Sequence, residues 1–281
     1  MRRLLPLLAL AACTQDNGLT RKPMDQVAVI TGDFDDVREP LKRLVIRHDL
    51  FDGLISTATW DEDYNPDRTL TAEGLLASAD ALDAYDAVLL ASGTRGLGLR
   101  QYNGVADDSF FLTDSDVIDR VRSYGDRGHG LLVTDWAYDL VEAAWPELVD
   151  FAGEDSVPDR AQCGQIGEVT GRVVDARLVQ ALGTDTVALS FNFSNWAVME
   201  AAGDEATVWI EGDVRCVFAG TGEELVLTGA PLLVSRESAL GGVVVSSFHL
   251  DAQRDGFVDA MLMEILGDLR PTEAQTYALD E

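Results

Sequence analysis

The stretch VIDRVRSYGDRGHGLLVTD, residues 117–135, joins a helical pattern to a strand pattern through one short turn. Acidic residues stand in the expected first turn after Thr113, the predicted N-cap, and glycines mark the helix end. The run GLLVT that follows is continuously apolar before its threonine, which predicts a buried parallel strand. A helix that leads directly into such a strand indicates a βαβ unit within a parallel sheet.

The same alternation extends outward in both directions. Buried strands are predicted at QVAVIT (26–31), LFDGLISTATW (50–60), YDAVLLASG (85–93) and GGVVVSSFH (241–249), and a helix is predicted over AEGLLASADAL (72–82). Residues from about 150 to 240 break this rhythm with hairpin-rich β segments. The sequence therefore predicts an α/β domain over residues 26–270, with a β-rich insertion before its last core strand.

The N-terminus, MRRLLPLLALAACTQ, has the pattern of an export signal. Arg2 and Arg3 precede an apolar stretch that is too short to span a bilayer. Its end, Leu-Ala-Ala-Cys at 10–13, resembles the bacterial lipobox, which implies a signal peptide over 1–12 and a lipid on Cys13. An ordinary secretory signal or a buried strand is the alternative. We therefore expect a polar tether over 13–25, a frayed tail over 271–281 and a lipid-anchored protein of the bacterial envelope. Thr14 favours the outer membrane by the lipoprotein sorting rule.

The chain is strongly acidic, with 21 basic and 49 acidic residues and a net charge of −28. Such a surface repels phosphate groups, which argues against nucleic acid as a partner. The membrane (through the lipid), an envelope protein and a small-molecule ligand remain as expected partners. Solubility at a cell surface explains the charge, and binding of divalent cations is the alternative.

One acidic loop has spacing that suits calcium. DEDYNPDRT places Asp61, Asp63, Asn65 and Asp67 at alternate positions, as in the start of an EF-hand loop. Pro66 stands where that loop requires glycine, and the twelfth position is Ala72. A solvated acidic loop is therefore the alternative to a calcium site, and calcium is the one cofactor that the sequence suggests.

Cys163 and Cys216 are the only cysteines besides Cys13. Export would place them in an oxidising compartment, where they form either a disulfide or two free thiols. The sequence alone does not show whether their Cα atoms come within bonding distance.

Three segments resemble the class I glutamine amidotransferase-like superfamily: YDAVLLASG, VIDRVRSYGDRGHGLLVTD and SFHLDAQ (247–253). The resemblance covers most of residues 26–268 and implies a flavodoxin-like parallel sheet flanked by helices. It also implies an oxyanion loop at ASGTRGLG, with Gly93 and Thr94 nearest to the substrate. The catalytic histidine of that family, with an acid two residues later, maps onto His249 and Asp251.

The nucleophile of that family is a cysteine on the elbow between a strand and a helix. The matching segment, LLVTDWAYD, contains Thr134, Asp135 and Trp136 but no cysteine. Glutamine hydrolysis through an acyl-enzyme thioester is therefore not expected.

These residues support three functional hypotheses. In the first, a non-catalytic domain binds a small ligand or a partner protein, with ligand contacts at Asp33, Gly93, Thr94 and Trp136, at the carboxyl ends of the strands. The second is a divergent hydrolase that uses Asp135, His249 and Asp251. A separation of Asp135 and His249 above about 8 Å would exclude it. The third is a structural envelope lipoprotein, in which the His249 ring bonds Asp251 or the backbone.

Overall fold

The computed structural model describes residues 26–54, 70–95, 101–102, 105–106, 114–153, 160–219, 221–238 and 241–268. The predicted signal peptide, the lipid site at Cys13, the tether, the tail at 271–281 and the calcium loop at 61–67 lie outside these residues.

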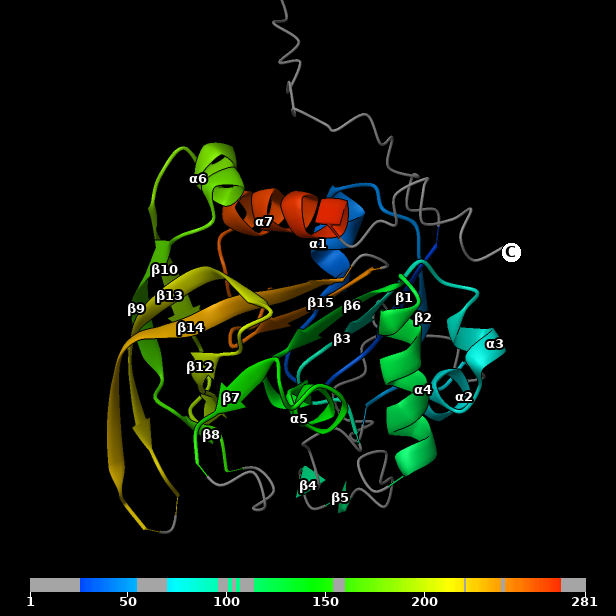
Figure 1. Cartoon of the computed structure of the whole chain (residues 1–281), viewed down its shortest axis with the longest axis horizontal. Coiled ribbons are helices and arrows are strands. Elements are labelled where there is room, and N and C mark those ends of the chain that lie inside the picture. The colour runs from blue at the N-terminus through cyan, green and yellow to red at the C-terminus, as the bar shows by residue number, and fades with distance from the viewer. Residues whose placement is uncertain are drawn as a thin grey trace, which may run out of the picture.

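A five-stranded parallel sheet forms the centre of the domain (Figure 1). Its strands lie in the order β2 (His48–Phe51), β1 (Val27–Ile30), β3 (Ala87–Leu90), β6 (Gly130–Thr134) and β15 (Gly241–Ser246). Every neighbouring pair in this series is parallel. This is the flavodoxin-like order 2-1-3-4-5.

Helices cover both faces of the parallel sheet (Figure 1). One face packs against α1 (Arg38–Arg43) and α7 (Asp255–Asp268), and the other packs against α2 (Ala72–Leu76), α3 (Ala79–Leu82), α4 (Ser115–Asp126) and α5 (Asp139–Ala144). Alternate residues of β1 enter the two cores, Val27 and Val29 on one side and Ala28 and Ile30 on the other. Burial on both sides explains why these strands are continuously apolar. No helix among the described residues is long and apolar enough to cross a membrane.

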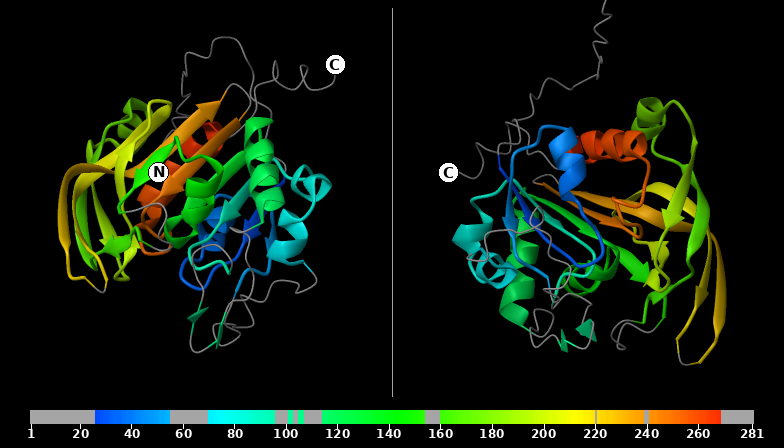
Figure 2. Two further views of the ribbon diagram at one scale, coloured as in Figure 1. Left: turned by 60° about the horizontal axis from the view of Figure 1, so that its bottom comes forward. Right: turned by 180° about the vertical axis from the view of Figure 1, so that it is seen from behind.

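The β-rich insertion lies before β15 and extends the same sheet in antiparallel fashion (Figure 2). β14 (Glu224–Ser238) pairs with β15, and β13 (Ala206–Val217), β9 (Gly167–Val173) and β10 (Thr186–Phe191) follow outward. The rest of the insertion comprises β7 (Val149–Phe151), β8 (Gln162–Gly164), α6 (Ala176–Leu182), β11 (Trp196–Ala197) and β12 (Met199–Ala202). The small pair β4 (Gln101–Tyr102) and β5 (Val105–Ala106) stands apart. The predicted fold class, including the insertion before the last core strand, is confirmed.

Three local predictions require correction. The helix predicted over residues 72–82 is two helices, because the Ser78 side chain accepts a hydrogen bond from the N–H of Ala81 and starts a new helix there. α4 is capped by Asp114, whose Oδ1 accepts from the N–H of Asp116, rather than by Thr113. The second strand ends at Phe51, well before Trp60, and residues 55–60 lie outside the described part.

The insertion contains a disulfide between Cys163 on β8 and Cys216 on β13, with Cα atoms 4.7 Å apart. Both residues are fully buried. The bond joins positions 53 residues apart and ties β8 to the central strand of the insertion.

Candidate functional site

Three side chains meet where three core strands end. Ser92 follows β3, Asp135 follows β6 and His249 follows β15, so the parallel register brings them to one edge of the sheet. Ligands of open α/β sheets bind outside the carboxyl ends of the strands. A ligand site is therefore expected at the carboxyl ends of these strands.

Asp135 occupies a strained backbone position. It has a φ of 42° and begins a short 3-10 helix, η4 (Asp135–Ala137), directly after β6. A non-glycine residue in this region costs about 1 kcal/mol or more, although Asp tolerates it better than most residues. A sharp turn from strand to helix presents its side chain above the end of the sheet. Asp135 thus stands on a sharp turn between β6 and the following helical segment, which we call the elbow.

The carboxylate of Asp135 is fully engaged. Its Oδ2 lies 2.8 Å from Nε2 of His249 and accepts from the Ser92 hydroxyl at 3.3 Å. Its Oδ1 accepts from the N–H of Ala197 at 2.7 Å. Asp135 is 1% exposed and His249 is 3% exposed. The two residues therefore form a buried ion pair that also ties the elbow to β11.

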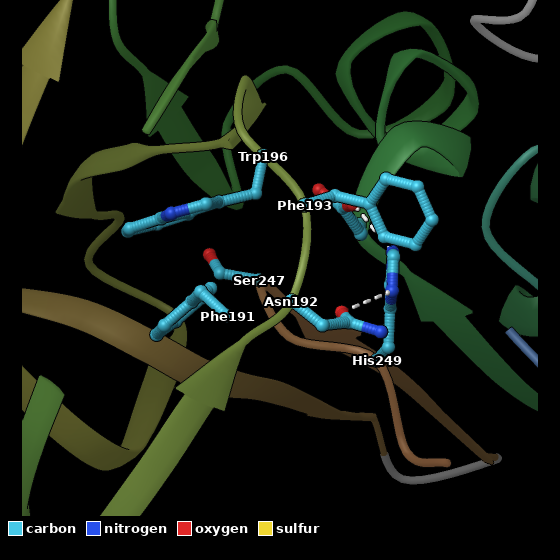
Figure 3. A pocket seen from close by; sticks show the side chains of 7 residues that line it. Phe191, Asn192, Phe193, Trp196, Ser247 and His249 are labelled. Carbon is cyan, nitrogen blue, oxygen red and sulfur yellow. Dashed lines mark hydrogen bonds and ion pairs between the residues drawn. The ribbon is translucent and has the colours of Figure 1, made fainter. Parts of the chain in front are cut away.

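The His249 ring has an acceptor at each nitrogen. Nδ1 lies 3.1 Å from Oδ1 of Asn192, and Nε2 contacts Asp135 (Figure 3). The doubly protonated imidazolium satisfies both contacts. Burial alone would lower the pKa of His249, but the hydrogen bond and charge of Asp135, with the charges of Asp35 and Asp251, raise this pKa to about 9. The histidine is therefore positively charged at neutral pH.

The segment after β10 closes over this pair. Phe193 lies against the His249 ring with centroids 5.5 Å apart (Figure 3). It also contacts Phe34. Phe34 in turn packs edge-on against Trp136, whose indole N–H donates to the carbonyl of Asn195. The space among the side chains around His249 has no room for a water molecule. We call residues 192–196 the clasp.

The Asp251 carboxylate bonds the backbone rather than the His249 ring. Its Oδ2 accepts from the backbone N–H of Asp36 at 3.2 Å, and among the described residues no hydrogen bond joins it to His249. The Nδ1 of the ring, which such an acid would orient, faces Asn192 instead. Asn192 of the insertion thus supplies the hydrogen-bond partner of the His249 ring that we expected Asp251 to supply.

The other predicted residues lie near this edge but are tied into the scaffold. Gly93 has a φ of +81°, and its carbonyl accepts from the N–H of Asp33. Thr94 is fully buried, and its hydroxyl donates to the carbonyls of Thr31 and Ala91. The Thr94 side chain is therefore not exposed to a substrate. Asp33 and Trp136 are partly exposed at the rim.

Ser92 was not predicted from the sequence as a site residue, and neither were two further residues, Asp35 and Asn192. Asp35 is buried, and its Oδ1 accepts from the N–H groups of Leu250 and Asp251, while its Oδ2 has no hydrogen-bond partner within the described part of the chain. Burial raises the pKa of Asp35 to about 6, although the charge of His249 opposes this rise. Asn192 reaches the site from the insertion. Both residues are distant in sequence from the elbow, so no local motif identifies them.

No group of three or more His, Cys, Asp or Glu side chains within the described ranges is placed to hold a metal ion. The predicted calcium ligands lie outside those ranges.

Comparisons with solved structures identify similar folds. A GMP synthase subunit from Thermoplasma acidophilum matches with a TM-score of 0.51 at 11% identity, over 92% of this chain and 100% of that chain. The mmIFT52 N-terminal domain matches with a TM-score of 0.51 at 12% identity, over 86% and 97%. A glutamine amidotransferase of Thermotoga maritima matches with a TM-score of 0.44 at 10% identity, over 88% and 85%.

No protein-family model and no curated protein sequence matches the chain. At these identities the structural likeness concerns the fold alone. The chain has an amidotransferase-like α/β fold.

Proposed function

We propose that this chain is an exported lipoprotein, anchored to the bacterial envelope through Cys13, whose amidotransferase-like domain binds a partner without catalysing a reaction. The lipobox pattern and the acidic composition support the location. The space around Asp135 and His249, at the carboxyl ends of the core strands, has no room for a water molecule. This closed site favours binding of a partner protein over binding of a small ligand.

The observation that carries the non-catalytic proposal is the buried pair of Asp135 and His249 beneath the clasp. A general base must be unprotonated at the working pH. The raised pKa of His249, about 9, keeps its ring charged, and both ring nitrogens already face protein oxygens. An Asp135 carboxylate with three hydrogen-bond contacts is likewise a poor nucleophile. The geometry therefore supports a structural role for both residues.

A divergent hydrolase is the second candidate, and one distance favours it. Asp135 and His249 lie 2.8 Å apart, far inside the limit of about 8 Å that would have excluded the hypothesis. Such an enzyme would have to displace Asn192 and Phe193 before a substrate could reach the pair. A purely structural envelope lipoprotein, the third hypothesis, would also have a closed site around Asp135 and His249, but it would bind no partner.

An activity comparison separates the first two candidates. Wild-type protein and Asp135→Asn are assayed with glutamine and with p-nitrophenyl acetate, and folding is checked by circular dichroism. We expect equal background rates for both proteins. Turnover by the wild type that Asp135→Asn loses while it stays folded would establish the hydrolase and contradict the proposal.

The anchor has its own test. In cells that export the protein, Cys13→Ala should move it from the membrane fraction to the soluble fraction, whereas the matched variant Thr14→Ala should stay with the membrane. Membrane retention of Cys13→Ala would refute lipid anchoring at this cysteine.

A further inference from the structure

The outer edge of the insertion presents a strand that is only partly covered. Among the strands that the structure describes, β10 is the last of the sheet and pairs only with β9 (Figure 1). Edge strands display unpaired N–H and C=O groups, and proteins block them with charged residues or proline. The β10 sequence TVALSF contains neither, although a quarter of the chain is charged.

The hydrogen-bond pattern shows which backbone groups face outward. The carbonyl of Asp185, just before β10, accepts from the N–H of Val173 in β9, so the backbone groups of the odd-numbered residues face that strand. Ser190 instead bonds Gln253, on the outer side. Along a strand, the backbone N–H and C=O groups of successive residues point alternately to one side and to the other. The N–H and C=O groups of residues 186, 188 and 190 therefore point to the free edge.

Two of these three positions are already covered by side chains. The Thr184 hydroxyl contacts both the N–H and the C=O of Thr186. The Gln253 amide accepts from the N–H of Ser190 at 2.9 Å and donates to its C=O at 2.8 Å. Gln253 thus makes the two hydrogen bonds that a neighbouring strand would make. Among the described residues, only Ala188 lacks a partner for its outward backbone groups.

A groove of about 470 Å³ runs beside Ala188. Leu182 of α6, Val187 of β10 and Phe257 of α7 supply apolar contacts along it. Figure 1 shows α6 beside the first half of α7, so the groove lies between these helices and the strand edge. It therefore offers backbone hydrogen bonds on one side and apolar side chains on the others, which are the two kinds of contact that an added strand needs.

One positive charge borders the groove. Arg254 lies immediately before α7 and lines the groove, and it has no ion-pair partner among the described residues. The neighbouring acid, Asp255, is paired with Arg43 at 3.2 Å. An arginine before the first turn of a helix opposes the helix dipole, so helix stability does not explain it. A carboxylate in the groove would be attracted to Arg254.

We infer that this groove binds an extended segment of a partner protein, which adds a strand to β10 through Ala188 and places an acidic side chain on Arg254. Apolar or small side chains of that segment would lie on Leu182, Val187 and Phe257. The inference rests on the proposed binding function and assigns it a surface on the outer side of β10.

Two synthetic peptides provide the probe. One is a hexapeptide of alternating threonine and valine that ends in glutamate, and the other ends in lysine, both with amidated C-termini. They are titrated into full-length ¹⁵N-labelled protein, and amide shifts are recorded by NMR. We expect the glutamate peptide to shift Ala188 and its neighbours and to bind roughly threefold or more tightly than the lysine peptide, as for an exposed ion pair.

Two variants at Ala188 separate strand addition from other binding. Ala188→Pro removes the outward N–H without breaking the ladder with β9, because proline is tolerated where the N–H faces away from the sheet. Ala188→Val keeps that N–H. We expect Ala188→Pro to lose peptide binding and Ala188→Val to retain it. Arg254→Glu, a surface change, should reverse the preference between the two peptides.

Equal binding to wild type and a folded Ala188→Pro, or no shift at Ala188 at millimolar peptide, would overturn the inference. A small molecule that shifts the groove residues where neither peptide does would also overturn it. None of these results bears on whether the domain is catalytic, because the Asp135→Asn activity comparison decides that question separately.

Discussion

At the scale of single residues, the elbow and the histidine form a structural unit. Removing one partner of a buried ion pair leaves the other charge buried and uncompensated. Asp135 would then keep its contacts to Ala197 and Ser92 but lose its counter-charge. The pair therefore holds the clasp, the elbow and the end of β15 together.

We predict that His249→Ala lowers the free energy of unfolding by about 3–5 kcal/mol, the usual range for a broken buried pair. Urea denaturation measures the change. The double variant with Asp135→Ala should cost less than the sum of the two single variants, because both singles remove the same interaction. Additive losses would show that the two side chains do not act together.

Stability should also depend on pH through His249. Its pKa in the folded protein, about 9, lies above the unfolded value of 6.5, so its contribution is complete below pH 6.5 and is lost as pH rises through 9. The loss amounts to roughly 3 kcal/mol. His249→Gln, which does not titrate, should lack this fall. Parallel urea curves at pH 6, 7.5 and 9 measure it, and identical pH profiles for both proteins would contradict it.

The residues of this site were only partly predictable. Asp135 and His249 were identified because each ends a recognisable buried strand, and parallel strands bring such ends together. The sequence did not reveal that the Asp251 carboxylate accepts from the N–H of Asp36. Asn192 enters from a loop more than 50 residues before His249 in the chain. No spacing in the sequence carries such long-range information.

At the scale of elements, α1 ends in an unfavourable way. Val45 has a φ of 57°, while its N–H bonds the carbonyl of Lys42 and the N–H of Ile46 bonds that of Leu41. This is a Schellman motif, in which the left-handed position normally holds glycine. A β-branched residue is strained there, and Val45 is 90% exposed, so packing does not offset the strain.

We predict that Val45→Gly raises the free energy of unfolding by about 1 kcal/mol, because the strain outweighs the added freedom of the unfolded chain. Val45→Ala keeps a Cβ and should gain less. Chemical denaturation of the three proteins tests the order. A loss of stability in Val45→Gly would show that the valine side chain makes contacts that outweigh its strain.

Element predictions succeeded where burial is strong and failed at boundaries. The core strands were visible because both faces are buried, which makes them continuously apolar. The break between α2 and α3 was missed because Ser78 caps a helix inside a pattern that is otherwise helical. The order of strands within the insertion could not be read from the sequence, since antiparallel pairing is decided by distant contacts.

At the scale of the whole molecule, the insertion lies to one side of the parallel core and supplies the clasp (Figure 2). It is continuous with the core sheet through β14 and β15. Its disulfide joins β8 to β13. β8 pairs with β11, and the N–H of Ala197 in β11 donates to the Asp135 carboxylate. The cross-link therefore supports the part of the insertion that closes the site.

We predict that replacing Cys163 and Cys216 together by alanine lowers the free energy of unfolding by about 4 kcal/mol, from the entropy of a loop of this length. Denaturation of oxidised protein against the double variant measures this loss. Addition of a reductant under denaturing conditions should destabilise the wild type and leave the double variant unchanged. Equal stability in the two proteins would mean that the bond adds nothing to the fold.

The protonation state of His249 tests the central claim most directly. In a ¹⁵N NMR titration of the imidazole, we predict an imidazolium with both nitrogens protonated at pH 7.5, which titrates near pH 9. Asp135→Asn should lower that pKa, because it removes the counter-charge. A neutral ring at pH 7.5, with a pKa at or below 6.5, would mean that the histidine is free to act as a base and would contradict the account.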